Sequence, residues 1–313
     1  MELDTVGSLG EFGIISRITK GLPAAPAVSV GPGDDAAVFL VNGSSVTSVD
    51  VLVEGVHFRR DWVPAEMLGR RAVAAADIEA MGAHQAAVLV GLTVPTDIPV
   101  AWIDDLAKGI RLECEAAGAV LVGGDLTRGR DVVISVTVMG ETRGTVPVLR
   151  SGAQPGDVVA FRGRLGWSAG GLAVLSRGFR SPRALVEAYQ LPQVPYGAGA
   201  EASLAGATAM IDVSDGLIAD LGHIADSSQV CIDLDSARFD VPVPLHAVAA
   251  ATGTDPLRFI LTGGEDHALV ATFPLGNVPP DWQVIGVVSD AEPGVLVDGQ
   301  PYDHAQGWDH FRH

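Results

Sequence analysis

The sequence predicts a two-domain chain of mixed α+β and α/β structure. Its 313 residues are more than one average domain needs. Apolar runs of strand length alternate with segments of helical periodicity along the whole chain. Aspartates stand at the ends of several such runs or on glycine turns, where α/β folds gather functional groups. We expect an α+β domain over residues 1–145 and an α/β domain over residues 146–313.

A stretch near the N-terminus predicts a hairpin. Asn42-Gly43 separates two apolar runs, and this dipeptide in that position is a strong hairpin signal. The expected strands cover residues 36–41 and 46–53.

Three aspartates belong to this expected hairpin. Asp34 and Asp35 would lie on the glycine turn that enters it, and Asp50 would lie among valines in its second strand. Carboxylates in such places are costly unless they are paired or bound to a metal. An acidic turn and a strand edge facing water are the alternative, and this stretch alone leaves both open.

The rest of the first half alternates between helices and strands. Residues 64–82 are expected to form a helix, with Asp77 on the same face as Val73 and Met81. A lone helical aspartate is usually solvated, so a functional role for Asp77 is one of two interpretations. The further expected elements are a strand at 88–94, a helix at 99–117, a strand at 120–122 that runs into Gly123-Gly124-Asp125, and a strand at 132–139.

The second half begins after a linker-like stretch. Asp212 ends a buried strand, and the helix that follows is expected to be capped by Ser214 or Asp215. The expected strands are 158–161, 209–211, 230–234, 268–273 and 284–288, and the expected helices are 167–176, 182–189, 217–225 and 243–251.

Composition limits the kind of partner. The net charge is −18 and the only lysines are Lys20 and Lys108. Affinity for duplex nucleic acid comes from basic contacts to phosphate, so nucleic acid is an unfavourable partner. Phosphorylated small molecules remain possible if divalent cations carry the positive charge. Ordinary surface solubility would also explain the acidity, but not the aspartates embedded in apolar runs.

Targeting signals and cysteine pairs are not evident. No apolar run reaches the roughly 18 residues that span a bilayer, and no signal peptide is evident. Cys114 and Cys231 fit no disulfide framework or zinc spacing, and both are interpreted as core residues. We expect a cytoplasmic protein without a membrane partner.

The acidic residues point to metal-assisted phosphate chemistry. The chain has no Gly-x-x-x-x-Gly-Lys-Ser/Thr loop, no dinucleotide fingerprint, no kinase-type catalytic loop and no Gly-x-Ser-x-Gly elbow. Bound ATP would therefore depend on metal ions, on backbone amides of the glycine turns and on arginine. Aspartates drawn from both halves could hold two or more Mg²⁺ ions at a domain junction.

Six short motifs, in order across nearly the whole chain, resemble the thiamine-monophosphate kinase family. This family belongs to the ATP-binding superfamily of aminoimidazole ribonucleotide synthetase, selenophosphate synthetase and a hydrogenase-maturation protein. The run Val-Glu-Gly-Val-His-Phe is the most diagnostic for the kinase branch. The motifs lie at residues 33–37, 50–58, 77–83, 123–125, 212–217 and 264–266.

The resemblance implies both a reaction and an assembly. ATP would transfer its γ-phosphoryl group directly, in line, to thiamine monophosphate, giving thiamine diphosphate. The acceptor is already anionic, so no dedicated general base is implied, and Mg²⁺ would supply alignment and charge neutralisation. The N-terminal domain would bind ATP and Mg²⁺ and contribute strands to a barrel shared in a homodimer, while the C-terminal domain would complete the active site.

The resemblance also implies roles for particular residues. Asp35 would be a turn residue or support for a ligand. In place of the polar and aromatic residues common in the family, this chain has Ala74-Ala75-Ala76, Leu126 and His267-Ala268; these departures leave the carboxylates intact and change the residues next to them. The implied metal ligands are Asp34, Asp50, Asp77, Asp125, Asp212 and Asp215; the implied ATP contacts are Gly124, Asp125, Arg150 and Ser214; the implied substrate contacts are His57, Glu265 and Trp308.

Two alternatives remain at this point. One is another ATP-dependent synthetase of the same superfamily, although no reactive cysteine lies near the N-terminus and the tail ends Phe311-Arg312-His313. The other is a catalytically inactive nucleotide-binding protein, which would bind ATP without turnover.

Overall fold

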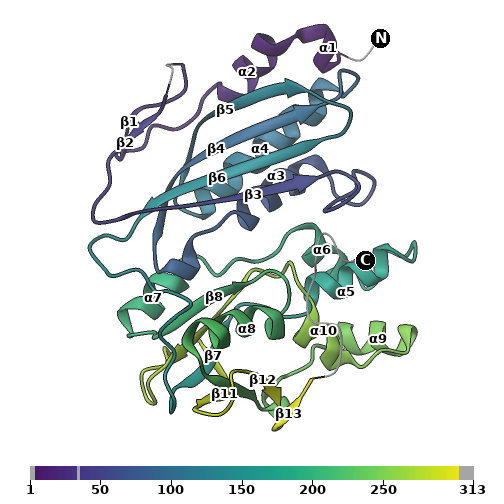
Figure 1. Ribbon diagram of the computed structural model, residues 1–313. Coiled ribbons are helices and arrows are strands. Elements are labelled where there is room, and N and C mark those ends of the chain that lie inside the picture. The colour runs from purple at the N-terminus through teal and green to yellow at the C-terminus, as the bar shows by residue number, and fades with distance from the viewer. Residues whose placement is uncertain (1–3, 34–35, 303–313) are drawn as a thin grey trace. The chain divides into compact units, whose positions relative to one another are not determined.

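The computed structural model describes residues 4–33 and 36–302 and divides into two compact units (Figure 1). Unit 1 comprises Met1–Ile78 and Ala83–Gly144, and unit 2 comprises Glu79–Gly82 and Thr145–His313. The mixed helix and sheet class predicted from the sequence is confirmed. Among the described residues, no helix is long and apolar enough to span a membrane.

Unit 1 is built on a four-stranded sheet in the order β3-β6-β4-β5. The pairs β3–β6 and β6–β4 are antiparallel, and β4–β5 is parallel. Helix α4 connects the parallel strands β4 and β5, and α3 packs against α4. Both helices lie on the same face of the sheet, which is the rear face in Figure 1. The bounds are β3 Ser45–Val53, α3 Ala65–Ala75, β4 His84–Val94, α4 Val100–Ala116, β5 Val120–Arg128 and β6 Val133–Glu141.

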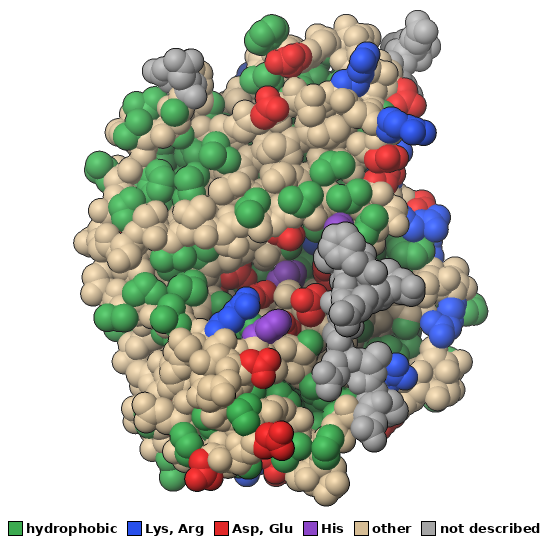
Figure 2. Space-filling view, viewed as in Figure 1, with side chains coloured by type: hydrophobic (Ala, Val, Ile, Leu, Met, Phe, Trp, Pro, Cys, Tyr) green, Lys and Arg blue, Asp and Glu red, His purple; other side chains and the backbone are tan. Residues whose placement is uncertain are grey.

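One face of this sheet is covered and the other is not. In β6, Ile134, Val136 and Val138 are buried, whereas the residues between them are only partly buried. On the opposite face, Val49 and Val51 of β3 are 62% and 41% exposed. Hydrophobic side chains show on the surface over this sheet in the space-filling view (Figure 2). The period-two alternation of the strands thus produces one packed face and one apolar face open to solvent.

Two glycines allow α3 and α4 to pack closely. A Cβ on Gly69 would lie 2.2 Å from the carbonyl oxygen of Leu106, and one on Gly109 would lie 1.9 Å from that of Glu66. Any larger residue at either position would force the helices apart. The apolar stripe of α4 predicted from periodicity is buried here, including Ile103, Leu106 and Ile110.

The predicted hairpin over residues 36–53 is wrong. β2 (Val38–Phe39) pairs instead with β1 (Val28–Val30), and β3 pairs with β6 along its whole length. The Asn42-Gly43 turn is bonded to the end of β6: the Asn42 N–H donates to Glu141 Oε2 at 2.5 Å. A turn signal reports a local change of direction but does not determine the partner of β3, which lies about 90 residues later in the chain.

Two other boundaries differ from prediction. Helix α3 ends at Ala75 because Ala76 leaves helical geometry, with φ −94° and ψ 63°, so Asp77 follows the helix instead of lying on its face. Strand β5 continues through Gly123-Gly124-Asp125 to Arg128, so Asp125 lies inside a strand and not on a turn after it. N-terminal to the sheet, α1 (Val6–Leu9) carries a capping box made by Thr5 and Ser8 and is followed by α2 (Glu11–Thr19).

Unit 2 is built on a seven-stranded sheet in the order β13-β12-β9-β11-β7-β10-β8. All predicted strands of the second half are present, and β12 and β13 are additional. The strands are β7 Val158–Arg162, β8 Ala209–Val213, β9 Cys231–Leu234, β10 Ala268–Phe273, β11 Gln283–Ser289, β12 Gly294–Val297 and β13 Gln300–Pro301. The helices are α5 Trp167–Leu175, α6 Arg183–Gln190, α7 Ala198–Leu204, α8 Leu217–Ser228, α9 Val243–Thr252 and α10 Pro256–Thr262, with 3₁₀ turns η1 Glu79–Met81 and η2 Ser236–Arg238.

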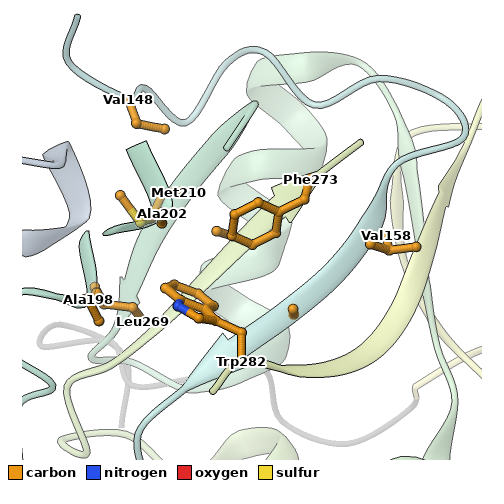
Figure 3. Close-up of a cluster of buried hydrophobic side chains, with 10 residues drawn as sticks. Val148, Val158, Ala198, Ala202, Met210, Leu269, Phe273 and Trp282 are labelled. Atoms are coloured by element: carbon orange, nitrogen blue, oxygen red, sulfur yellow. The ribbon is translucent and has the colours of Figure 1, made fainter. Parts of the chain in front are cut away.

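One buried hydrophobic cluster of unit 2 lies on the face of this sheet that α7 contacts. Met210, Ala271 and Ala160 are register partners on adjacent strands and share one face. Phe273 and Trp282 meet edge to face on it, with ring centroids 5.4 Å apart (Figure 3). Helix α8 contacts β8, β9 and β12, and β8 contains Asp212 and leads into the turn before α8 that is described below.

The short helices α7 and α10 were not predicted. The start of α7 is held by Glu79, whose Oε2 accepts the N–H groups of Gly197 and Gly199 at 2.9 and 3.0 Å. Burial raises the pKa of the Glu79 carboxyl, whereas the hydrogen bonds from Gly197 and Gly199 act in the opposite direction and lower it. A Cβ on Gly199 would lie 1.8 Å from the Glu79 carbonyl, so the close approach requires glycine.

Candidate active site

The strand register of unit 1 separates two of the predicted ligands. Asp50 pairs with Val136 and lies two residues before the buried Leu52, so it shares the covered face of the sheet. Asp125 pairs with Gly91 and precedes the buried Leu126, so its side chain projects from the opposite, uncovered face. These two carboxylates therefore do not converge on one face of this sheet.

The Val-Glu-Gly-Val-His-Phe run forms a tight loop after β3. The Glu54 N–H donates to the Val132 carbonyl and Glu54 pairs with Arg60 at 2.6 Å, while Gly55 has a φ of 84°. The Val53 N–H donates to His57 Nδ1 at 2.9 Å. In a neutral imidazole this acceptor places the proton on Nε2. The loop thus orients His57 with Nε2 as a hydrogen-bond donor.

In unit 2, Asp212 and the turn after it lie at the edge of the sheet. Asp212 is the fourth residue of β8 and pairs with Leu269 of β10. The next residues form the turn Ser214–Gly216 before α8. The N-cap of α8 is Gly216 and not Ser214 or Asp215 as predicted. Arg150 follows Leu149, whose carbonyl accepts the N–H of Met210, so Arg150 lies on the segment beside β8.

The amides of this turn are bound by a residue that sequence reasoning missed. The N–H groups of Ser214, Asp215 and Gly216 donate to Oδ2 of Asp220 at 3.0, 3.1 and 3.1 Å. Burial, followed by the charge of Asp212, raises the pKa of Asp220 to about 7. The three amides of this particular turn are thus already bonded to a carboxylate of the protein.

The Gly-Glu-Asp motif forms a second loop against this turn. The N–H of Glu265 donates to the Ser214 carbonyl at 2.8 Å, and that of His267 donates to the Val213 carbonyl at 3.0 Å. Glu265 and His267 have positive φ values of 64° and 49°, which non-glycine residues seldom adopt and which often mark functional loops. His267 is buried, with Nδ1 3.5 Å from Asp212 Oδ2.

Asp266 ties the same loop to α5. Its Oδ1 accepts the Ser168 N–H at 2.8 Å and its Oδ2 accepts the Gly166 N–H at 2.5 Å. The carboxyl therefore caps the helix from a distant part of the chain. Complete burial outweighs these bonds and raises the pKa of Asp266 to about 7. As with Asp220, its role is to hold backbone, and it was not among the predicted site residues.

The predicted metal ligands come from several separate segments of the chain. Within residues 4–33 and 36–302, no group of three or more His, Cys, Asp or Glu side chains is placed to hold a metal ion. Asp34, Asp35 and Trp308 lie outside the described residues. The available donors, such as Asp50, Asp212 and Asp215, are oxygen ligands of the kind that Mg²⁺ prefers. Mg²⁺ commonly uses one or two carboxylates with waters and substrate phosphates.

A sequence signal for the missed residues existed. Asp220 stands in the first turn of the helix that follows the Asp-Val-Ser-Asp-Gly run, where acidic residues commonly interact with free amides. Asp266 gave no local signal, because the amides that it accepts lie about 100 residues earlier.

The fold and these loops define a class of protein. Residues 33–142 match the family described as AIR synthase related protein, N-terminal domain. The hydrogenase maturation protein HypE in complex with ATP shares the fold, with a TM-score of 0.72 at 18% identity over 91% of this chain and 88% of that one. The protein is thus a member of the AIR-synthase-related fold class.

Closer relatives narrow the class to one family. The thiamine-monophosphate kinase of Mycobacterium tuberculosis is 48% identical over 99% of this chain and 94% of that protein, and the one from Aquifex aeolicus is 34% identical over 97% and 98%. A structure of AaThiL complexed with AMPPCP and TMP superposes with a TM-score of 0.80 at 30% identity, covering 99% of this chain and all of that one. The chain belongs to the thiamine-monophosphate kinase family, as its motifs predicted.

Proposed function

We propose that this protein phosphorylates thiamine monophosphate with ATP to give thiamine diphosphate and ADP. The observation that carries the proposal is the 48% identity to a thiamine-monophosphate kinase over nearly the whole of both chains. The related structure with AMPPCP and TMP bound supports ATP and thiamine monophosphate as the two substrates. Both alternatives, a different synthetase and an inactive binder, lack a comparable observation.

Binding and alignment are the tasks of the protein's own residues in this proposal. The acceptor is a phosphate oxygen that is already ionised, so no side chain has to remove a proton. His57, with its proton on Nε2, is suited to donate to an anionic oxygen of the substrate. Glu265 is assigned to the thiamine substrate, and Gly124, Arg150 and Ser214 are assigned to ATP, together with Asp125. Trp308 keeps its predicted substrate role.

Mg²⁺ fits the donor set and is part of the proposal. Asp212 and Asp215 in unit 2, and Asp50 and Asp77 in unit 1, are the described carboxylates assigned to it; Asp34 and Asp125 keep their predicted roles. When bound, Mg²⁺ would neutralise phosphate charge and align the reacting groups. The chain has 38 acidic residues against 20 Lys and Arg residues, so bound divalent cations would add positive charge where the phosphates bind.

One assay tests the reaction. The protein is incubated with ATP, Mg²⁺ and thiamine monophosphate, and thiamine diphosphate is measured by chromatography. Product that depends on all three components is expected. Folded protein that binds ATP but forms no product would overturn the proposed function and favour the inactive binder. Thiamine in place of thiamine monophosphate is the control substrate and should give no diphosphate.

We also propose that the protein is a homodimer that uses the uncovered sheet face of unit 1. Val49 and Val51 expose apolar surface there, beside Ser135 and Gly91 in register. An open apolar face of this kind is a frequent interaction surface. If the uncovered faces of two such four-stranded sheets met, one from each copy, the two sheets could form the shared barrel that the family resemblance implies. A cytoplasmic location stays a prediction from the sequence.

A further inference from the structure

Asp220 is a buried carboxylate with an unusual set of partners. It is 2% exposed, and a single oxygen, Oδ2, accepts three consecutive backbone N–H groups, those of Ser214–Gly216. Charged acceptors make stronger hydrogen bonds than neutral ones. Three successive amides that converge on one atom restrict the backbone angles of all three residues. Asp220 therefore determines the shape of this turn.

The turn is held from its other side as well. The Ser214 carbonyl accepts the N–H of Glu265 at 2.8 Å, and a Cβ on Gly216, where φ is 127°, would lie 2.8 Å from the Thr262 carbonyl. The amides and a carbonyl of the turn are thus occupied by protein groups. In the proposed function, the ligand contacts of this turn are assigned to the side chains of Ser214 and Asp215.

We infer that Asp220 is a positioning residue that acts through Ser214 and Asp215, setting the affinity of this turn for Mg²⁺ and for the nucleotide phosphates. The inference rests on the proposed function, in which Ser214 contacts ATP and Asp215 contacts Mg²⁺. Outer residues that orient metal ligands typically change metal affinity or activity by about 10–100-fold when they are replaced. Asp220 does not touch the reacting groups in this scheme.

The test compares two variants at Asp220 with a matched control. Asp220→Ala removes the acceptor, whereas Asp220→Asn keeps an amide oxygen that can accept the same N–H groups. Asp157→Asn is the control: Asp157 is also buried, and its Oδ2 accepts the Gln154 N–H and the Thr208 hydroxyl at 2.9 and 2.6 Å. It lies at the other end of the sheet, next to Val158, which pairs with Phe273.

Three quantities are measured at a temperature where all variants are folded: the Mg²⁺ concentration that gives half-maximal activity, KM for each substrate, and amide hydrogen exchange at residues 214–216. For Asp220→Ala we expect the Mg²⁺ requirement and KM for ATP to rise about 10–100-fold, with KM for thiamine monophosphate within threefold. Exchange at 214–216 should accelerate. Asp220→Asn should recover most of the loss, and Asp157→Asn should change only thermal stability.

The outcomes separate this inference from the proposed function. If Asp220→Ala keeps the wild-type Mg²⁺ requirement and KM for ATP and loses only thermal stability, as Asp157→Asn does, Asp220 is structural and the inference is wrong. If the wild type forms no thiamine diphosphate, the proposed function fails, and Mg²⁺-dependent binding of a non-hydrolysable ATP analogue replaces activity as the readout. Equal binding by wild type and Asp220→Ala then overturns the inference.

Discussion

Asp212 combines three properties at the level of a single residue. It lies on the edge strand β8, it is close to the buried His267, and its charge acts on the buried Asp220. Such a grouping of carboxylates is costly without a compensating cation, since like charges in a partly buried place repel each other. Asp212 is therefore the described residue of unit 2 that the proposed metal chemistry needs most.

We expect Asp212→Asn to lower kcat/KM by about 100-fold or more, because a neutral amide is a poorer ligand than a carboxylate for the Mg²⁺ that would neutralise the phosphate charge. Steady-state kinetics at saturating Mg²⁺ measure the effect, and circular dichroism checks the fold. Asp233→Asn is the matched control, since Asp233 is also a partly buried strand aspartate, in β9. Near-normal turnover by Asp212→Asn would contradict the metal assignment.

Asp266 should make stability depend on pH in an identifiable way. Its pKa is raised to about 7 in the folded protein and is near 3.8 in the unfolded chain, so the folded state holds more protons between those values. Stability of the wild type therefore falls as the pH rises from about 4 to about 7. Asp266→Asn cannot titrate, so its free energy of unfolding relative to wild type should rise over that window by up to about 4 kcal/mol.

Urea denaturation at several pH values measures this difference. Asp298→Asn is the control, because bonds from Ser236 lower the pKa of Asp298 and the stability it contributes is lost only below about pH 4. For that variant the difference from wild type should stay flat between pH 5 and 7. A flat profile for Asp266→Asn as well would show that Asp266 is ionised throughout.

At the level of elements, unit 2 brings two loops together by means of glycine. A Cβ on Gly264 would lie 2.2 Å from the Ser214 carbonyl, so the Gly-Glu-Asp loop can approach the turn after β8 only without a side chain at that position. Two residues of the same loop, Glu265 and His267, have positive φ values. Glu265 therefore combines an unfavourable backbone conformation with a proposed contact to the thiamine substrate.

Gly264→Ala should destabilise the protein by about 1–3 kcal/mol, as overpacking does, and should lower activity by displacing Glu265. Gly222→Ala is the matched control in the neighbouring helix α8, where a Cβ would meet no atom within 4 Å. It should be neutral or stabilise by up to about 1 kcal/mol, since alanine is the better helix former. Thermal unfolding and the kinase assay measure both. Equal behaviour of the two variants would refute the packing argument.

The elements were predicted with unequal success, and the difference has a physical pattern. Helix α4 and strand β6 were recognised from their own periodicity, because each buries one regular face. The prediction of a hairpin at Asn42-Gly43 was wrong because β3 pairs with β6, a strand far away in the sequence that the local turn signal does not identify. Helices α7 and α10 were missed because they are only seven residues long and depend on tertiary contacts such as those of Glu79.

At the level of the whole molecule, the proposed dimer can be tested on the uncovered face of unit 1. The double variant Val49→Glu and Val51→Glu places charge on that face and should give a monomer with an unchanged fold, because burying two unpaired carboxylates is costly. Analytical ultracentrifugation measures the mass. Val243→Glu is the control: Val243 is 81% exposed in α9 of unit 2. A wild-type monomer, or a double variant that still dimerises, would contradict this interface.

The sequence by itself determined the family, the mixed fold and the set of carboxylates assigned to the proposed chemistry. These follow from short motifs and from the two- and 3.6-residue periods, which are local properties of the chain. Only the tertiary structure decided that β3 pairs with β6, that Asp50 and Asp125 face opposite sides of one sheet, and that Asp266 holds a loop to the start of α5. The reason is that strand partners, buried faces and acceptors for distant amides depend on which segments meet, and no local pattern encodes that choice.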